Sequence, residues 1–179
     1  LGLDFEAAVT VAAEAAQGEV CQAANDNDPA QVVVSGHRGA VERALEIAKA
    51  KGAKRAILLP VSAPFHCALM QPAAAAMAEA LAGVAVSAPV VPVVANVRAA
   101  AVSDPEVIRG LLVEQVTGSV RWRESVAYMA AHGVTRFFEI GAGKVLSGLV
   151  KRIAEGAVGV SVGGPNDIAA AKDALTASA

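Results

Sequence analysis

A histidine at the end of an apolar segment is the residue best placed for catalysis in this sequence. His66 follows Pro64 and Phe65, in a bend between a run rich in leucine and an alanine-rich helix. Catalytic side chains of α/β proteins gather at strand ends, and an imidazole titrates near neutral pH, so His66 is a candidate general base. A histidine in such a bend is often only a structural hydrogen-bonding residue, and the residues alone leave both interpretations open.

No convincing nucleophile accompanies this candidate base. Cys67 is its direct neighbour in the chain, and adjacent side chains diverge. Ser62 lies on a predicted strand without an exposed, strained turn. Ser35 follows a valine run, but Val33 occupies the first glycine position of G-x-S-x-G, and capping of the next helix explains Ser35 better. The sequence therefore offers a base whose hydroxyl partner has to come from elsewhere.

A glycine-rich turn, Gly141-Ala142-Gly143, lies between a predicted strand and a helix and invites a phosphate-binding or dinucleotide-binding interpretation. Leu146 stands where the third glycine of G-x-G-x-x-G would be, and Lys144 completes no P-loop. A tight turn, in which the absent Cβ atoms let the backbones pack closely, is the favoured explanation. Glu139, before the turn, is a candidate site carboxylate or a structural hydrogen-bond acceptor.

Composition excludes several classes of protein. The 179 residues are 55% hydrophobic and 18% charged, which is typical of a globular chain and excludes a disordered tail or a disulfide mini-protein. A formal net charge of −2 gives no electrostatic reason to expect nucleic-acid binding. Cys21 and Cys67 lie far apart with no zinc-like spacing, so we expect reduced thiols, a cytoplasmic location and no metal site.

The chain shows no sign of membrane insertion or secretion. It begins at Leu1 with no secretory signal, which suggests a piece of a longer protein. Prolines interrupt the uncharged run between Glu79 and Arg98, so no membrane span is expected there.

One segment is distinctly basic. From Arg38 to Arg55 six basic residues stand against Glu42 and Glu46, a local balance of +4. Such a segment usually forms the solvated face of a helix, but it would also steer an acidic protein or a phosphorylated ligand. It therefore supports an alternative function as a non-catalytic binding module.

Hydrophobic periodicity predicts an α/β fold with two parts. A helix over 4–17, strands over 20–25 and 31–35, a helix over 37–50 and a strand over 55–61 have the order of a split βαβ (ferredoxin-like) unit. Its first strand would lie upstream of Leu1, and an Asn-Asp-Asn-Asp-Pro turn would join the two strands of the hairpin. We predict that residues 1–61 form this small subdomain.

Residues 62–179 are predicted to form the second part, in which strands alternate with helices. Helices are expected over 70–81, 106–115, 123–131, 144–153 and 166–175, and strands over 89–97, 136–140 and 158–162. This alternation predicts a mainly parallel sheet covered on both faces.

Three ordered motifs resemble those of the malonyl-CoA:acyl carrier protein transacylase family of bacterial fatty acid synthesis. They lie at residues 25–37 (NDNDPAQVVVSGH), 60–70 (PVSAPFHCALM) and 138–146 (FEIGAGKVL), and the resemblance covers essentially the whole chain. Acyltransferase domains of polyketide synthases are similar, but less closely. The resemblance implies that residues 62–179 are the C-terminal part of an α/β-hydrolase-like core that carries the ferredoxin-like subdomain.

The resemblance also implies roles for single residues. His66 would be the base of a ping-pong transfer, oriented by the main-chain carbonyl of Gln115. Phe65 would suit an unbranched malonyl group, because a bulky ring there crowds an α-methyl, and Asn27 would face the pantetheine arm. Contacts to the carrier protein are predicted from the basic segment, at Arg38, Lys51, Lys54 and Arg55.

The chain departs from the family pattern in its extent. The family's nucleophile serine, malonate-binding arginine and oxyanion donors belong to an upstream half that this sequence does not contain, and Ala142 replaces the usual proline of the glycine turn. We therefore expect an acyltransferase portion that is inactive alone, with the N-terminal segment, a coenzyme A thioester and acyl carrier protein as partners. Malonyl-CoA would be its substrate, with no permanently bound cofactor. A nucleotide-binding protein that uses the glycine turn remains a third reading.

Overall fold

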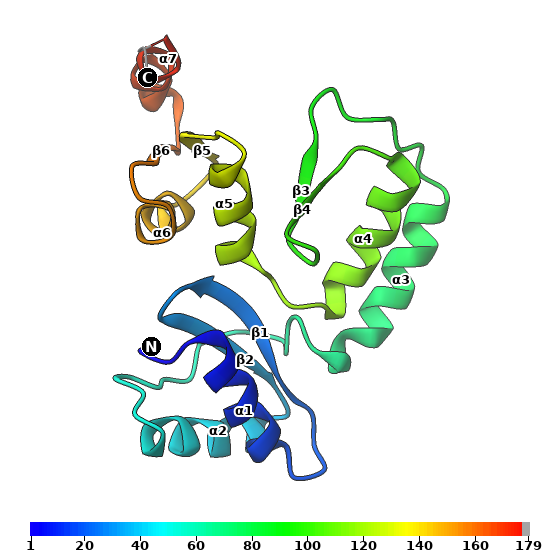
Figure 1. Cartoon of the computed structure of the whole chain (residues 1–179). Helices are drawn as coiled ribbons and strands as arrows, with labels where there is room; N and C mark the ends of the chain where they lie inside the picture. Colours follow the sequence, from blue (N-terminus) through cyan, green and yellow to red (C-terminus); the bar gives the residue numbers. More distant parts are fainter. Residues whose placement is uncertain (177–179) are drawn as a thin grey trace. The chain divides into compact units, whose positions relative to one another are not determined.

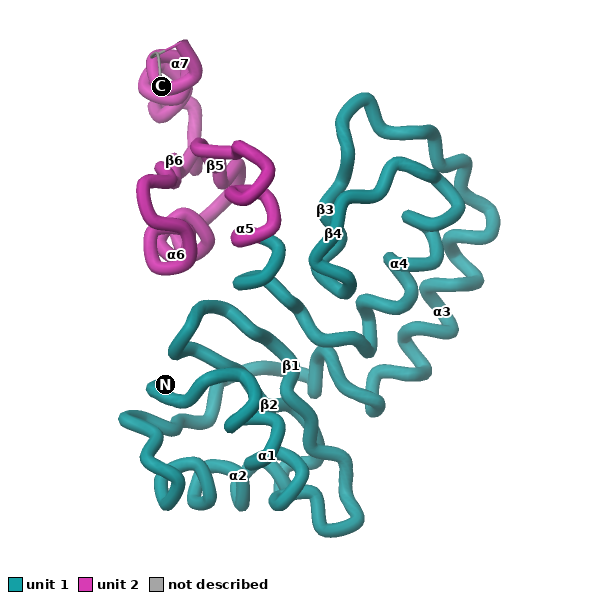
Figure 2. Tube along the Cα trace, in the orientation of Figure 1, with its two compact units in different colours: residues 1–125 teal, residues 126–179 magenta. Residues whose placement is uncertain are grey.

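The chain folds as a mixed α/β protein in two compact units. The computed structural model describes residues 1–176, and the chain divides into Leu1–Ser125 and Val126–Ala179 (Figure 2). The subdomain boundary predicted between residues 61 and 62 falls inside the first unit, and it stays a prediction.

A hairpin and two helices begin the first unit (Figure 1). They are helix α1 (Phe5–Ala16), strands β1 (Cys21–Asp28) and β2 (Gln31–Gly36), and helix α2 (Arg38–Ala50). The Asp4 carboxylate caps α1 by accepting a hydrogen bond from the Ala7 amide at 2.8 Å, as predicted. The core shared by these elements consists of small side chains, Val11, Ala12, Ala15, Cys21, Ala40 and Ala44, which allow the helices to approach the hairpin closely.

The predicted hairpin turn is displaced. Strand β1 continues through the Asn-Asp-Asn-Asp segment, and the chain reverses at Pro29 and Ala30. The two aspartates are nearly inaccessible and their carboxylates are used within the fold, Asp26 by Arg123 and Asp28 by the Ala30 amide. Tertiary contacts therefore override the turn propensity of these residues.

The strand predicted over residues 55–61 is not formed in the described structure. The segment is extended, but it belongs to none of the three two-stranded sheets. Ile57, Leu58 and Leu59 are consequently about half exposed. Apolar β-type residues make a strand only where a neighbouring strand accepts and donates the backbone hydrogen bonds.

The rest of the first unit is a helical pair with a second hairpin. A short 3₁₀ turn, Ala68–Met70, leads into α3 (Gln71–Ala82), which packs against α4 (Pro105–Thr117). In the chain, the two helices are connected through an antiparallel hairpin of β3 (Val93–Ala95) and β4 (Ala100–Val102). The strand predicted over 89–97 thus shrinks to three residues, and β4 was not predicted because its small alanine-rich sequence carries no strand signal.

The second unit contains a parallel strand pair, as its sequence predicted. Helix α5 (Trp122–Ala131) leads into it, followed by β5 (Arg136–Ile140), α6 (Val145–Ile153) and β6 (Val158–Val162). A 3₁₀ turn (Pro165–Asp167) then precedes α7 (Ile168–Thr176). Strands β5 and β6 pair in parallel through the connecting helix.

The prediction of one mainly parallel sheet in residues 62–179 is wrong for the described residues 62–176, because β3 and β4 pair antiparallel in a sheet separate from that of β5 and β6. None of the helices described is long and apolar enough to cross a bilayer.

Candidate active site

His66 lies in a strained turn and hydrogen-bonds a main-chain carbonyl. Its backbone is left-handed, with φ 57°, a conformation that a residue with a Cβ adopts rarely and that is enriched at functional sites. The buried Cys67 thiol donates to the Pro64 carbonyl at 3.2 Å and closes the turn. The ring atom Nδ1 lies 3.0 Å from the carbonyl oxygen of Gln115.

This contact determines which ring nitrogen carries the hydrogen. A carbonyl oxygen can only accept, so Nδ1 of His66 is the donor and Nε2 of the neutral ring keeps its lone pair. An imidazole held in this way can take a proton from a hydroxyl or thiol at Nε2. The sequence-predicted pair of His66 and Gln115 is therefore brought together.

The carbonyl of Gln115 is available because α4 ends there. Gly118 takes an extended conformation and donates its amide to Glu114, so the helix stops before a later residue could use the Gln115 carbonyl. The Gln115 side chain holds the following turn by donating from Nε2 to the Gly118 and Ser119 carbonyls, at 3.0 and 3.4 Å. The backbone carbonyl and the side-chain amide of Gln115 thus both form hydrogen bonds that stabilise the C-terminus of α4.

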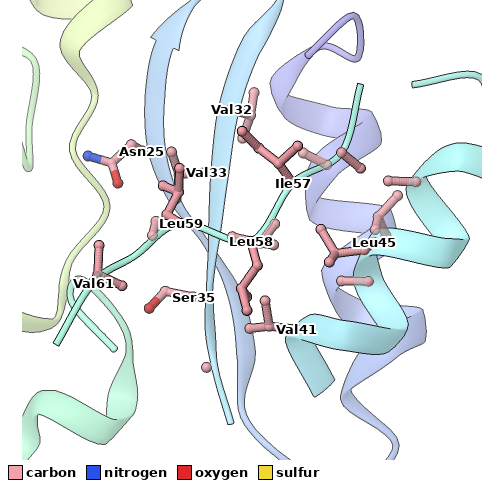
Figure 3. Close-up of a pocket in the computed structure, with 18 of the residues that line it drawn as sticks. Asn25, Val32, Val33, Ser35, Val41, Leu45, Ile57, Leu58, Leu59 and Val61 are labelled. Carbon is pink, nitrogen blue, oxygen red and sulfur yellow. The ribbon is translucent and has the colours of Figure 1, made fainter. Parts of the chain in front are cut away.

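A cavity of about 960 Å³ opens beside the first hairpin (Figure 3). Its lining includes Ile57, Leu58 and Leu59 of the extended segment and Val41 and Leu45 of α2, all of which are labelled in Figure 3. Most of its lining is aliphatic, with the β2 valines among it.

Both predicted substrate residues, Phe65 and Asn27, line this cavity, whereas His66 and Gln115 do not. Of the predicted carrier-protein contacts, Arg38 and Arg55 also line it, and Lys51 and Lys54 do not. Phe65 precedes His66 in the chain and is 47% exposed.

The serine candidates stay unconnected to the base. Ser62 is exposed and Ser35 is half-buried, and within the described part of the chain no serine hydroxyl hydrogen-bonds to the His66 ring.

Most of the basic segment is paired with carboxylates. Arg38 bonds Glu42 at 2.9 Å and Lys51 bonds Glu14 at 2.8 Å. Arg43 and Lys49 pair with Glu19 and Glu46. Adding Glu14 and Glu19 reduces the local balance from +4 to +2. Lys54 and Arg55 form no ion pair with any residue of the range 1–176, so they carry the free positive charge.

The glycine turn after β5 is explained by backbone conformation. Gly141 and Gly143 have φ of 140° and 106°, and a Cβ on either would meet open space, so the expectation of close backbone packing there is wrong. Glu139 accepts from the Leu146 and Ser147 amides at the start of α6. These hydrogen bonds, chiefly those from Ser147, lower the pKa of the Glu139 carboxyl. Of the two interpretations of Glu139, these contacts favour the structural hydrogen-bond acceptor.

Two buried groups were not identified from the sequence as important. The Asp26 side chain is 1% exposed, and Arg123 grips it with Nε 3.0 Å from both carboxylate oxygens and Nη2 at 2.8 Å. Breaking a fully buried pair costs about 3–5 kcal/mol, and less here because Arg123 is a third exposed. The only indication of this pair in the sequence is an acidic residue that follows the apolar residues of β1, and it is recognised only once the structure is known.

The second buried group is the Cys21 thiol. Burial raises the pKa of this thiol, so the cysteine stays unreactive.

No cluster of three or more metal-ligating side chains occurs among the residues that the structure describes.

Comparisons with known proteins place the chain beside one group of enzymes. No family model matches the sequence. It is 48% identical over 171 residues to the malonyl CoA-acyl carrier protein transacylase of Escherichia coli, covering 96% of this chain and 55% of that protein. The chain therefore spans about half the length of the curated relatives it matches.

Solved structures give the same result. A crystal structure of an acyl-carrier-protein S-malonyltransferase from Bartonella henselae superposes with a TM-score of 0.93 at 52% identity, over 99% of this chain and 56% of that one. A malonyl-transacylase in complex with its type II polyketide acyl-carrier protein superposes with a TM-score of 0.93 at 42% identity, over 97% of this chain and 56% of that one.

Proposed function

Because the chain belongs to the malonyl CoA-acyl carrier protein transacylase family, we propose that it supplies the catalytic histidine for malonyl transfer in fatty acid biosynthesis. The transfer runs from coenzyme A to the phosphopantetheine thiol of acyl carrier protein. The nucleophile serine comes from an upstream segment outside this chain. The single observation that carries the proposal is the His66 Nδ1 hydrogen bond to the Gln115 carbonyl, which leaves Nε2 free as a base.

The proposed mechanism has two matching halves. In the first, Nε2 of His66 takes the serine proton while the serine oxygen bonds to the malonyl carbonyl carbon, and the departing coenzyme A thiolate receives that proton. In the second, Nε2 takes the proton of the phosphopantetheine thiol, whose sulfur attacks the malonyl ester, and the proton returns to the serine. The Gln115 carbonyl holds the ring and stabilises the imidazolium that forms in each half.

The test is a chimera that restores full length. The portion of the Escherichia coli relative without a counterpart here is placed before Leu1, and kcat/KM for malonyl transfer to acyl carrier protein is measured. His66→Ala should lower kcat/KM by about 10²–10⁴-fold, the range for loss of a general base. His132→Ala is the matched control, because that ring also bonds a main-chain carbonyl, of Tyr128, at 2.7 Å. Undiminished transfer by His66→Ala would overturn the assignment.

Two further residues are proposed to contact the substrate. Phe65 limits the acyl group to an unbranched malonyl, and its position directly before His66 and its exposed ring support this role. Asn27 faces the pantetheine arm, and the lack of a pairing partner on β2 together with its half-buried position supports a contact with this ligand. Malonyl-CoA acts as a substrate, with no resident cofactor, and the reaction takes place in the cytoplasm.

The finer description of the fold is part of the proposal. Residues 1–61 form a ferredoxin-like subdomain, and residues 62–179 form the C-terminal part of an α/β-hydrolase-like core. The free edge of β2 and the unpaired extended segment 55–61 lie on the same cavity, so one added strand would pair with both. An upstream first strand of the split βαβ unit would occupy that position.

A second candidate function is carrier-protein binding without catalysis. The free charges of Lys54 and Arg55, with Arg38 and Lys51 nearby in the sequence, support contact with an acidic carrier protein. Double reversal, Lys54→Glu with Arg55→Glu, should weaken binding of acyl carrier protein at low salt, whereas Lys49→Glu, already paired with Glu46, serves as control. Binding with no transfer by the chimera would favour this candidate, and equal binding by all variants would exclude the surface. A polyketide carrier protein, tested in parallel, would distinguish the polyketide alternative.

A further inference from the structure

Strand β1 hydrogen-bonds to the segment that follows His66 and to the segment that follows Gln115. At one end, the Gln22 Oε1 atom accepts the Ala68 amide at 2.7 Å, two residues after His66. Further along, Asp26 holds Arg123, which follows the segment that carries Gln115. The strand is therefore a common support for the donor and the acceptor of the His66 hydrogen bond.

The support on the Gln115 side is a short parallel bridge. The Val120 amide donates to the Ala24 carbonyl at 2.8 Å, and the Asp26 amide donates to the Val120 carbonyl at 2.9 Å. The Ser119 hydroxyl adds a third bond to the Ala24 carbonyl at 3.2 Å. Gln115 in turn donates its side-chain amide to the Gly118 and Ser119 carbonyls. The contacts are thus continuous from Asp26 to the carbonyl that faces the ring.

The Asp26 and Arg123 side chains clamp this bridge. The guanidinium faces the carboxylate as a fork: its Nε–H is shared between the two oxygens, and Nη2 lies 2.8 Å from Oδ2. Because the carboxylate is almost inaccessible to water, the contact is strong and directional. That hydrogen bond also raises the pKa of the Arg123 guanidinium. The pair cannot separate without leaving an uncompensated buried charge, so it fixes where α5 begins relative to β1.

We propose that Asp26 and Arg123 are positioning residues for His66. They hold residues 118–123 against β1, and through this contact they keep the Gln115 carbonyl within hydrogen-bond distance of Nδ1. The ring then keeps the tautomer that leaves Nε2 unprotonated. The inference deepens the proposed function and rests on it, since positioning matters for catalysis only if His66 is the base.

A structural role alone makes a different prediction. If the pair only stabilised the fold, its removal would lower the free energy of unfolding and leave the His66 ring unchanged in the molecules that remain folded. A positioning role requires the tautomer equilibrium of His66 to move in those molecules.

The tautomer is measured by ¹⁵N NMR of the imidazole nitrogens in the 179-residue chain at neutral pH. The His66 signals are assigned by comparison with His37→Gln and His132→Gln. In the unsubstituted chain the Nδ1–H form should predominate. Asp26→Asn should raise the Nε2–H share several-fold, and Arg123→Lys, which keeps the charge but loses the fork, should have an intermediate effect. Arg121→Gln is the matched control, because Arg121 pairs with Glu124 and its side chain makes no hydrogen bond to β1.

Each outcome decides the proposal. If Asp26→Asn does not fold, Arg123→Lys alone gives the answer, and an unchanged tautomer in a folded variant overturns the inference. A shift as large in Arg121→Gln would also overturn it, because any loosening near α5 would then suffice. Failure of the proposed function is seen separately, as full transfer activity in the His66→Ala chimera while the tautomer still responds to Asp26.

Discussion

The hydroxyl of Ser147 donates to the Glu139 carboxylate at 2.7 Å, joining the first turn of α6 to the end of β5. Ser147 also presents its amide to the same carboxylate at 2.8 Å, and its hydroxyl lies 2.7 Å from that of Ser161 on β6. One small side chain thus connects the helix to both parallel strands of the second unit.

This contact predicts a pH-dependent stability of the second unit. Because the folded pKa of Glu139 is lowered, its contribution is present above the unfolded pKa and is lost as pH falls through the folded pKa. Glu139→Gln should lower the urea midpoint of this unit at pH 7, and the difference should shrink on acidification to about pH 3. A constant difference at both pH values would contradict the assigned cause.

Gly159 on β6 should not tolerate a side chain. A Cβ there would lie 2.5 Å from the Ser147 carbonyl oxygen, which belongs to the helix packed on the strand. Gly159→Ala should destabilise the protein by about 1–3 kcal/mol, as measured by urea unfolding. Gly148→Ala is the matched control: it lies on α6 with no atom within 4 Å, and it should stabilise the helix by about 0.5–1 kcal/mol.

Gly118 should be equally restricted, with a consequence for the candidate base. Its Cβ would meet a Val97 methyl at 2.7 Å and the Glu114 carbonyl oxygen at 2.9 Å, where α4 ends. Gly118→Ala should cost about 1–3 kcal/mol and displace the carbonyl that faces His66. The chimera described above should therefore lose kcat with little change in KM, whereas Gly110→Ala, in open space on the same helix, should keep both.

Phe65 should control the size of the acyl group. Replacing the ring with a hydroxymethyl, Phe65→Ser, removes the bulk predicted to crowd an α-methyl. The ratio of kcat/KM for methylmalonyl-CoA to that for malonyl-CoA should rise about 10-fold in the chimera, the scale of one methyl contact. Leu69→Ala, on the same cavity but beyond the His66 turn, should leave the ratio unchanged.

Elements with strong local signals could be predicted from the sequence. The ranges 136–140 and 158–162 are confirmed as β5 and β6, and α1 begins after its predicted cap at Asp4. The errors occur where a residue's partner lies far away in the chain. Residues 25–28 looked like a turn, but Asp26 is satisfied by Arg123, 97 positions later, and residues 55–61 lack a neighbouring strand.

The candidate site also depends on residues whose partners lie far away in the chain. The pairing of His66 with Gln115 could be expected from resemblance alone, since nothing in the local sequence shows that a helix ends with its carbonyl turned to a ring 49 positions away. The left-handed backbone of His66 and the clamp on Asp26 had no local signal either, because both depend on long-range packing.

An irregularity in β1 limits how this region of the chain can vary in length. Ala24 and Asn27 have no pairing partner on β2. The inaccessible side chains of β1 are those of Cys21, Ala24, Asp26 and Asp28, so the spacing is three residues from Cys21 to Ala24 and two residues after that. Substituting Ala24 by another small residue preserves this phase. Deleting it while β1 keeps its bulge would shift every later residue of the strand by one position, which rotates Asp26 toward water and brings the Asn27 amide to the carboxylate's place. Evolution and protein engineering alike are therefore freer to exchange side chains here than to shorten the strand by one residue.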